Sequence, residues 1–188
     1  MSGLGFATTF CLIFGGFACG PSAARAAGNE RPTVTPPAPA VYSFATAGDA
    51  RSDGERLAAR WAPVFAQEVS AEHPERDRPL RVDFDDDWVT TNDWMNLAGN
   101  VRHREAVAYV SSILTTTHAF LTYTLFYPRD WQEIVCVPYA CHDNDLEVVE
   151  LVVARAARTG EGDALVFVET KTHRDYLAVR GAEVARAA

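Results

Sequence analysis

The chain has 188 residues, of which 17 are Lys or Arg and 25 are Asp or Glu, so its formal net charge is −8. An acidic chain without a basic patch interleaved with aromatic residues is not typical of nucleic-acid binding, and we exclude nucleic acid as a partner. The same excess of carboxylates favours the binding of a cation.

The first 27 residues read as a secretory signal peptide. An apolar stretch over 6–18 is followed by the small-residue run PSAARAAG. That stretch is too short for a membrane span, and no later one reaches about 20 apolar residues, so we expect no transmembrane segment. The sequence therefore predicts a secreted or periplasmic protein. A second interpretation makes Cys19 a lipidated N-terminus, because Ala18 precedes it and Gly20 follows it.

Residues 28–48 are rich in Pro, Ala and Thr and show no hydrophobic period, which is typical of an extended tether. The remainder, 49–188, is long enough for one core and is expected to form a single β-rich domain.

A helix is predicted at the start of that domain, over 51–69. The spacing places Leu57, Trp61 and Phe65 on one helical face, with Ser52 or Asp53 as the N-cap. Pro63 is expected to bend or end the helix.

The next segment, 73–100, is polar and rich in turn residues. Its aspartates at 83 and 85–87 resemble a calcium loop, but the Gly and the closing Glu of an EF-hand are missing. We interpret it as a solvated loop with Trp88 and Trp94 folded under it. The alternative gives one of the aspartates a minor role as a ligand.

Four strands are predicted after this loop, because β-branched and aromatic residues dominate the segments 105–114, 116–127, 145–156 and 164–171. Short connections between them, including a turn over 158–162, favour an antiparallel sheet. The fold class is therefore mainly β with an N-terminal helix (α+β). The sequence after His173 indicates an early end and a fold that is incomplete at its C-terminus.

Candidate metal ligands gather between the second and third predicted strands. They are Asp130, His142, Asp145 and Glu147. In an extended segment Asp145 and Glu147 share a face, and His142 joins them if the chain bends at the two residues before Asp145. Three carboxylates and an imidazole form a hard ligand set that favours Mg²⁺ or Ca²⁺, with Mn²⁺ and Zn²⁺ as alternatives. The competing interpretation is a solvated acidic turn without metal.

Two cysteines and a histidine lie near these residues. In an oxidising compartment Cys136 and Cys141 are expected to form a disulfide; the alternative has Cys136 buried and Cys141 free. His173 follows the fourth predicted strand, and an antiparallel partner could return it to the same place. It is a weak candidate for a catalytic base, and the alternative is a surface histidine.

The segments Tyr127-Pro128-Arg129-Asp130 and His142-Asp143-Asn144-Asp145-Leu146-Glu147 resemble the signature of the secreted necrosis-inducing (NLP-type) superfamily. The resemblance implies an antiparallel β-sandwich in which the matching Asp, His, Asp and Glu hold a divalent cation. The chain departs from the signature at Cys141, Asn144 and Leu146. A closer likeness is to secreted bacterial and Vps62-like relatives of that superfamily, and it covers the segments 57–64, 83–88, 115–131 and 142–147.

Three functions compete at this point. The first, which we favour, is a secreted cation-binding β-domain that recognises a glycan or lipid head group without turnover. The second is a metal-dependent hydrolase in which the cation activates water and His173 relays a proton. The third is a structural domain with no metal. No Ser-His-Asp triad, phosphate loop or dinucleotide turn is recognised.

Overall fold

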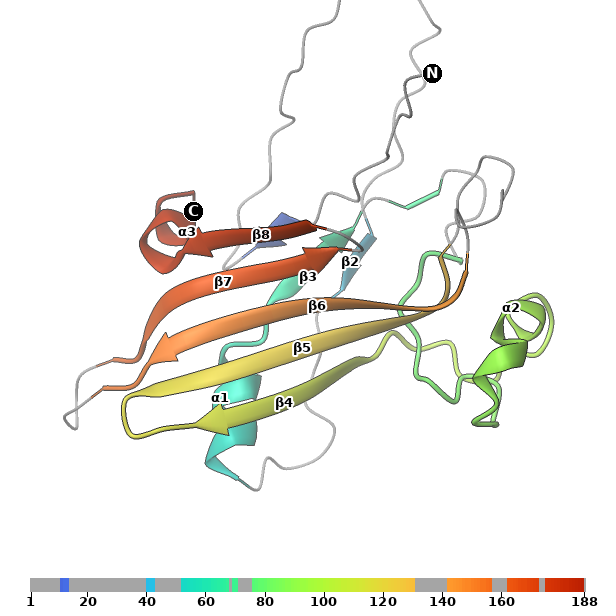
Figure 1. The fold of residues 1–188 in the computed structure, drawn as a ribbon, viewed down its shortest axis with the longest axis horizontal. Coiled ribbons are helices and arrows are strands. Elements are labelled where there is room, and N and C mark those ends of the chain that lie inside the picture. Colours follow the sequence, from blue (N-terminus) through green and yellow to red (C-terminus); the bar gives the residue numbers. More distant parts are fainter. Residues whose placement is uncertain are drawn as a thin grey trace, which may run out of the picture.

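The computed structural model describes residues 11–13, 40–42, 52–67, 69–70, 76–130, 142–156, 162–172 and 175–187. These residues form a mainly β structure with a five-stranded antiparallel sheet, a three-stranded sheet and a few short helices (Figure 1). The large sheet has the order β4-β5-β6-β7-β8, so each strand pairs with its neighbour in sequence. Its strands are β4 (Ala108–Leu114), β5 (His118–Arg129), β6 (Asp143–Ala154), β7 (Ala164–Thr172) and β8 (Asp175–Arg180).

Helix α1 (Asp53–Arg60) begins where the sequence predicts it. Ser52 is the N-cap, and its Oγ accepts a hydrogen bond from the Glu55 N–H at 3.2 Å while Glu55 Oε2 accepts one from the Ser52 N–H at 2.6 Å. The predicted helix over 51–69 is wrong beyond Arg60. Pro63 disfavours a helical conformation at the residue before it, and the chain continues as strand β3 (Val64–Gln67).

Strand β3 is the centre of the small sheet. It pairs antiparallel with β1 (Cys11–Ile13) on one side and with β2 (Ala40–Tyr42) on the other. Strand β1 falls within the predicted signal peptide and β2 within the predicted tether, and both assignments stay predictions. The sandwich of the NLP type also stays a prediction, since what the structure shows is the antiparallel sheet with its helices.

All four predicted strands are present, and none of their ends is shifted by more than three residues. Beyond His173, β8 pairs with β7 and is followed by helix α3 (Gly181–Ala187), and the expectation of a fold that is incomplete at its C-terminus stays a prediction. The side chains of Tyr176 and Leu177 in β8 are exposed, which is typical of an edge strand.

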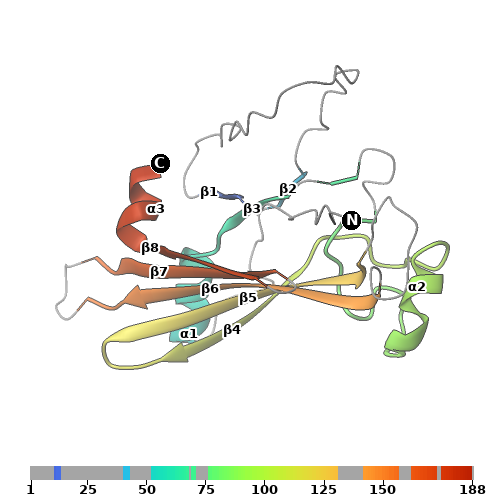
Figure 2. The same cartoon turned by 45° about the horizontal axis from the view of Figure 1, so that its top comes forward.

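The main core lies on the face of the large sheet that α1 and β3 cover (Figure 2). Alternate residues of β5 point to it, and the hydroxyl of Tyr123 donates a hydrogen bond to the Ala58 carbonyl of α1 at 2.7 Å. Burial raises the pKa of that hydroxyl. Buried residues of this core are Ala58, Phe65, Ala119, Leu121, Tyr123, Leu125, Tyr127, Val149, Leu151, Val153 and Val168.

A smaller core lies at Phe126, whose carbonyl accepts a hydrogen bond from the Leu80 N–H at 2.9 Å. Leu80 and Phe126 pack with Phe84, which is fully buried. The expectation that tryptophans fold under the acidic loop is wrong for Trp88, which is 73% exposed. Phe84 supplies the apolar anchor instead, because its neighbours in sequence are aspartates that face outward from this core.

Candidate functional site

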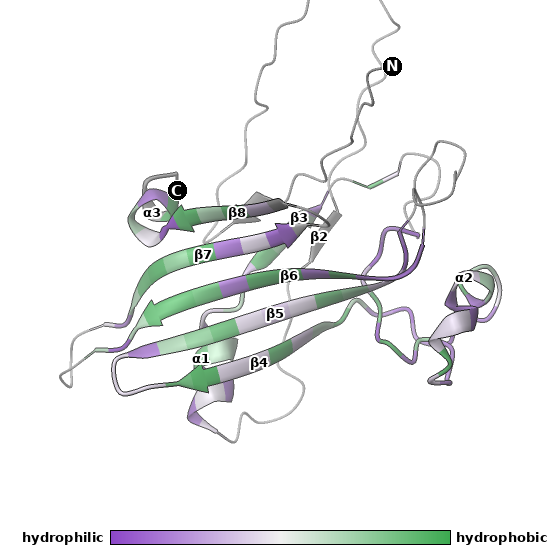
Figure 3. Cartoon of the chain, in the orientation of Figure 1, coloured by the Kyte–Doolittle hydropathy of each residue, from purple (hydrophilic) through white to green (hydrophobic). Residues whose placement is uncertain are grey.

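The predicted ligands lie at one end of the β5–β6 pair, here called the β5–β6 end and comprising residues 127–130 and 142–147. The ladder pairs Arg129 with Asp143, and the Asp130 N–H donates a hydrogen bond to the His142 carbonyl at 2.8 Å. Asp130 and His142 are therefore brought directly opposite each other. In Figure 3 the end of β6 nearest to α2 is hydrophilic, in contrast to the middle of the strand.

Asp145 and Glu147 lie on the face that carries the main core. Asp145 is opposite Tyr127 and Glu147 is opposite Leu125, and paired residues of an antiparallel ladder share a face. Glu147 is 7% exposed, while Leu146 between the two carboxylates is 54% exposed. The predicted arrangement of Asp145 and Glu147 is confirmed by this register.

The predicted bend next to Asp145 is also present. Asn144 has a φ of 61°, a left-handed conformation, while the ladder continues past it to the pair of Arg129 and Asp143. Even so, no three His, Cys, Asp or Glu side chains gather into a group that could hold a metal ion anywhere in the described ranges, which include all four predicted ligands. The metal assignment stays a prediction. Cys19, Cys136, Cys141 and His173 lie outside the described residues.

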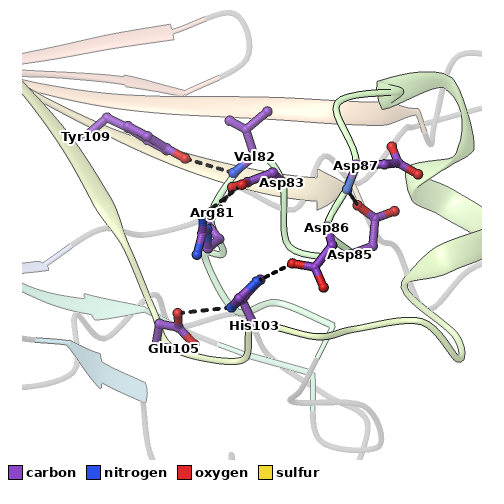
Figure 4. Close-up of polar contacts among 9 residues, drawn as sticks. All are labelled: Arg81, Val82, Asp83, Asp85, Asp86, Asp87, His103, Glu105 and Tyr109. Atoms are coloured by element: carbon purple, nitrogen blue, oxygen red, sulfur yellow. Dashed lines mark hydrogen bonds and ion pairs between the residues drawn. The ribbon is translucent and has the colours of Figure 1, made fainter.

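The acidic loop, residues 81–87, is held by an ion pair within it and by a contact with His103 (Figure 4). The Arg81 guanidinium donates to both carboxylate oxygens of Asp83 at 2.7 Å, and this contact lowers the pKa of Asp83. Asp86, at a φ of 70°, lies 2.6 Å from His103 Nε2. These two carboxylates have partners, so their role is to hold the loop.

The remaining two aspartates of the loop lie toward a short helical segment, which consists of η1 (Thr90–Asn92) and α2 (Asp93–Asn96). Asn96 Nδ2 donates to Asp85 Oδ2 at 2.5 Å, and Asn92 Nδ2 donates to Asp87 Oδ2 at 3.2 Å. Neither carboxylate is neutralised by a cationic side chain through these contacts, because an amide carries no charge.

Asp93 is the most buried carboxylate of this region, at 1% exposure. Burial raises the pKa of its carboxyl group to about 7, with further contributions from Asp85, Asp143 and Asp87. Asp143 also has a raised pKa, mainly through burial, although Arg129 opposes the rise. A group of negative charges thus sits between α2 and the end of β6.

Arg129 is a cation that acts on this group, and it lies against an aromatic ring. Its guanidinium lies over the ring of Trp94, and burial lowers the pKa of Arg129 to about 10. Stacking on Trp94 fixes the guanidinium at the rim of the acidic group, where it favours the ionised form of Asp143.

Sequence reasoning missed Asp93 and Asp143 as site candidates. Asp93 lies in a polar stretch that predicts solvation, and its burial depends on contact with a segment some 50 residues later in the chain. The one available signal was the repetition of an Asn next to an Asp, as Asn92-Asp93 and as Asp143-Asn144.

Comparison of the chain with protein-family models, with curated proteins and with solved structures gave no match. Within the described part of the chain, no helix is long and apolar enough to cross a membrane.

Proposed function

We propose that this chain is a secreted β-domain that binds a divalent cation at the β5–β6 end and uses it to recognise a glycan or lipid head group without turnover. The observation that supports the proposal is the ladder register. It brings Asp130 opposite His142 and places Asp145 and Glu147 on one face a few residues away. Four potential ligands from two strands thus occupy one end of a rigid sheet.

A cation at this place would suit the chemistry of a glycan or lipid head group. Hydroxyl and phosphate oxygens are hard donors that complete the coordination of Mg²⁺ or Ca²⁺ when the protein supplies only part of the shell. His142 is exposed and Asp130 and Asp145 are partly exposed, so a ligand can reach the cation from solvent. A hydrolase at the same residues would need a base, and the candidate His173 lies outside the described residues.

The test is a thermal melt of the chain after chelation, with Mg²⁺, Ca²⁺, Mn²⁺ and Zn²⁺ added back separately. At a cation concentration one hundred times Kd, binding to the folded state alone stabilises by about 2.7 kcal/mol. We expect a saturable rise in Tm with Mg²⁺ or Ca²⁺. Asp145→Ala should remove the part of that response due to this site and leave the apo fold intact.

The matched control is Glu150→Ala, which removes a carboxylate from the same strand. Glu150 is partly buried. It lies an odd number of residues from Asp145 and Glu147, so it is on the opposite face of β6. An equal metal response in the wild type and in Asp145→Ala would contradict the assigned ligand. Absence of any metal response would support a structural domain.

A further inference from the structure

Among the described residues, four buried side-chain oxygens without a hydrogen-bond donor lie where η1 and α2 contact β6. They are Asn92 Oδ1, Asp93 Oδ2, Asp143 Oδ1 and Asn144 Oδ1, here called the buried acceptor cluster. Leaving one buried acceptor unsatisfied costs about 1–3 kcal/mol. Four acceptors on two touching segments therefore call for partners that are positive or donate hydrogen bonds, and one ion between the segments can serve several of them.

The orientation of the two amides is fixed by their nitrogens. Asn144 Nδ2 donates to the Thr90 carbonyl at 2.9 Å, and Asn92 Nδ2 donates to Asp87 Oδ2 at 3.2 Å. Turning either amide over would set an oxygen against another oxygen. Each Oδ1 must therefore face away from its nitrogen's acceptor, and both are buried.

The two carboxylates of the cluster carry charges of the same sign, and the cations Arg129 and His142 act on Asp143 but not on Asp93. The Asp93 carboxylate makes no ion pair within the described part of the chain, and Asp85, Asp87 and Asp143 all act on it as like charges. Water alone satisfies acceptors but does not offset this repulsion, whereas a divalent cation does both. The donor set consists of carboxylate and amide oxygens only, which is the set that Ca²⁺ accepts with flexible geometry.

We propose that Asp93 and Asp143, together with the amide oxygens of Asn92 and Asn144, hold a calcium ion between η1–α2 and β6. The site has two carboxylates and two amides, so it is compatible with the lack of a three-membered His, Cys, Asp or Glu group in the described ranges. Bound calcium would hold η1 and α2 against β6. This proposal does not rest on the ligands assigned at the β5–β6 end.

The experiment is a calorimetric titration of the chelated full chain with Ca²⁺ at pH 8, followed by melts with and without Ca²⁺. The key variant is Asp93→Asn, which keeps the shape of the side chain and removes its charge. We expect it to lose at least tenfold in Ca²⁺ affinity at one site. Without Ca²⁺ its Tm should equal or exceed that of the wild type, because a buried unpaired charge has been removed.

The matched control is Asp86→Asn, which makes the same chemical change in the acidic loop. Asp86 is exposed, bonds to His103, and has a left-handed φ that Asn adopts readily. Its Ca²⁺ affinity should equal that of the wild type. The chelated melt of Asp93→Asn shows directly whether the variant folds.

A second variant keeps the proposal testable if Asp93→Asn does not fold. Asn144→Gly keeps the left-handed backbone and removes one proposed ligand, so the affinity should fall about tenfold. Full Ca²⁺ affinity in either folded variant would overturn the proposal, as would a wild type without Ca²⁺ binding. If Asp145→Ala abolishes all Ca²⁺ binding while Asp93→Asn retains it, the cation belongs to the β5–β6 end alone, and this proposal fails while the proposed function stands.

Discussion

Side chains are buried both in the middle of the β5–β6 pair and beside its β5–β6 end, but burial stabilises the fold in the middle and destabilises it beside the end. In the middle, Leu121 and Leu151 face each other across the ladder with no exposed surface. Their burial stabilises the fold by about 25 cal/mol for each Å² removed from water. Beside the end, Asp93 is 1% exposed and its Oδ2 has no hydrogen-bond donor in the described ranges. Burial there costs free energy until a partner arrives.

The strongest test of the middle is Leu151→Ala. Leu151 is fully buried between β5 and β7, so the substitution should lower the free energy of unfolding by about 2–5 kcal/mol, as loss of contacts and a cavity combine. Urea unfolding monitored by circular dichroism gives the value. Val110→Ala, on a side chain that is 50% exposed, should change stability by less than about 0.5 kcal/mol. Equal losses in the two variants would show that the middle is not the main source of stability.

The next test concerns pH and the buried Asp93. Its pKa of about 7 in the folded state lies above the ordinary value of 3.8, so the folded state binds more protons between these values. In chelator, stability should therefore fall as pH rises from about 4 to 7 and then level off. The expected loss is about 2 kcal/mol, roughly half of the full pKa difference, because solvent near the acidic loop screens part of it.

Asp93→Asn isolates this contribution from other carboxylates. Asp83, whose pKa is lowered, acts with the opposite sign, so the informative quantity is the difference between wild type and variant at each pH. We expect that difference to grow from pH 4 to pH 7, measured by urea unfolding. A constant difference across the window would show that Asp93 is ionised throughout.

Tyr123→Phe probes the contact between the middle of β5 and helix α1. The hydroxyl is buried and donates to the Ala58 carbonyl at 2.7 Å, so its removal should cost about 1–2 kcal/mol. Tyr109→Phe is the control, because that hydroxyl accepts from the Val82 N–H at an exposed position. A larger loss for Tyr109→Phe would reverse the ranking of the two contacts.

The smallest expected effect is at the cap of α1. Ser52→Ala removes the acceptor for the Glu55 N–H and should lower stability by about 1 kcal/mol, seen as a modest decrease in Tm. Ser52→Asp keeps an acceptor and should retain most of that stability. If both variants lose equally, the hydroxyl acts through some contact other than the cap.

The sequence predicted the middle of the sheet well, because alternation at Leu121, Tyr123 and Leu125 is a local pattern with a direct physical cause. Prediction from the sequence failed where contacts between residues far apart in the chain determine the structure. Residues 64–67 continue a helical pattern but form β3 after Pro63, and the apolar residues of β8 follow one another without the alternation that marks a strand.

The candidate site shows the same division. The shared face of Asp145 and Glu147 follows from the two-residue period of a strand, so it could be predicted. The burial of Asp93 could not, since η1 and α2 contact β6 across a long stretch of chain, where a hydrogen bond from Asn144 to Thr90 joins residues 54 positions apart. Polar composition predicts solvation, and only the fold shows which polar residues it encloses.

The order of strands in the large sheet has a consequence for how the chain folds. Because every strand from β4 to β8 pairs with its neighbour in sequence, the sheet can grow one hairpin at a time and needs no long crossover. Such local pairing gives a low contact order, which favours rapid folding for a β protein. The slower step should be the docking of α1 and β3, which share one core with residues of β5, β6 and β7 that lie far along the chain.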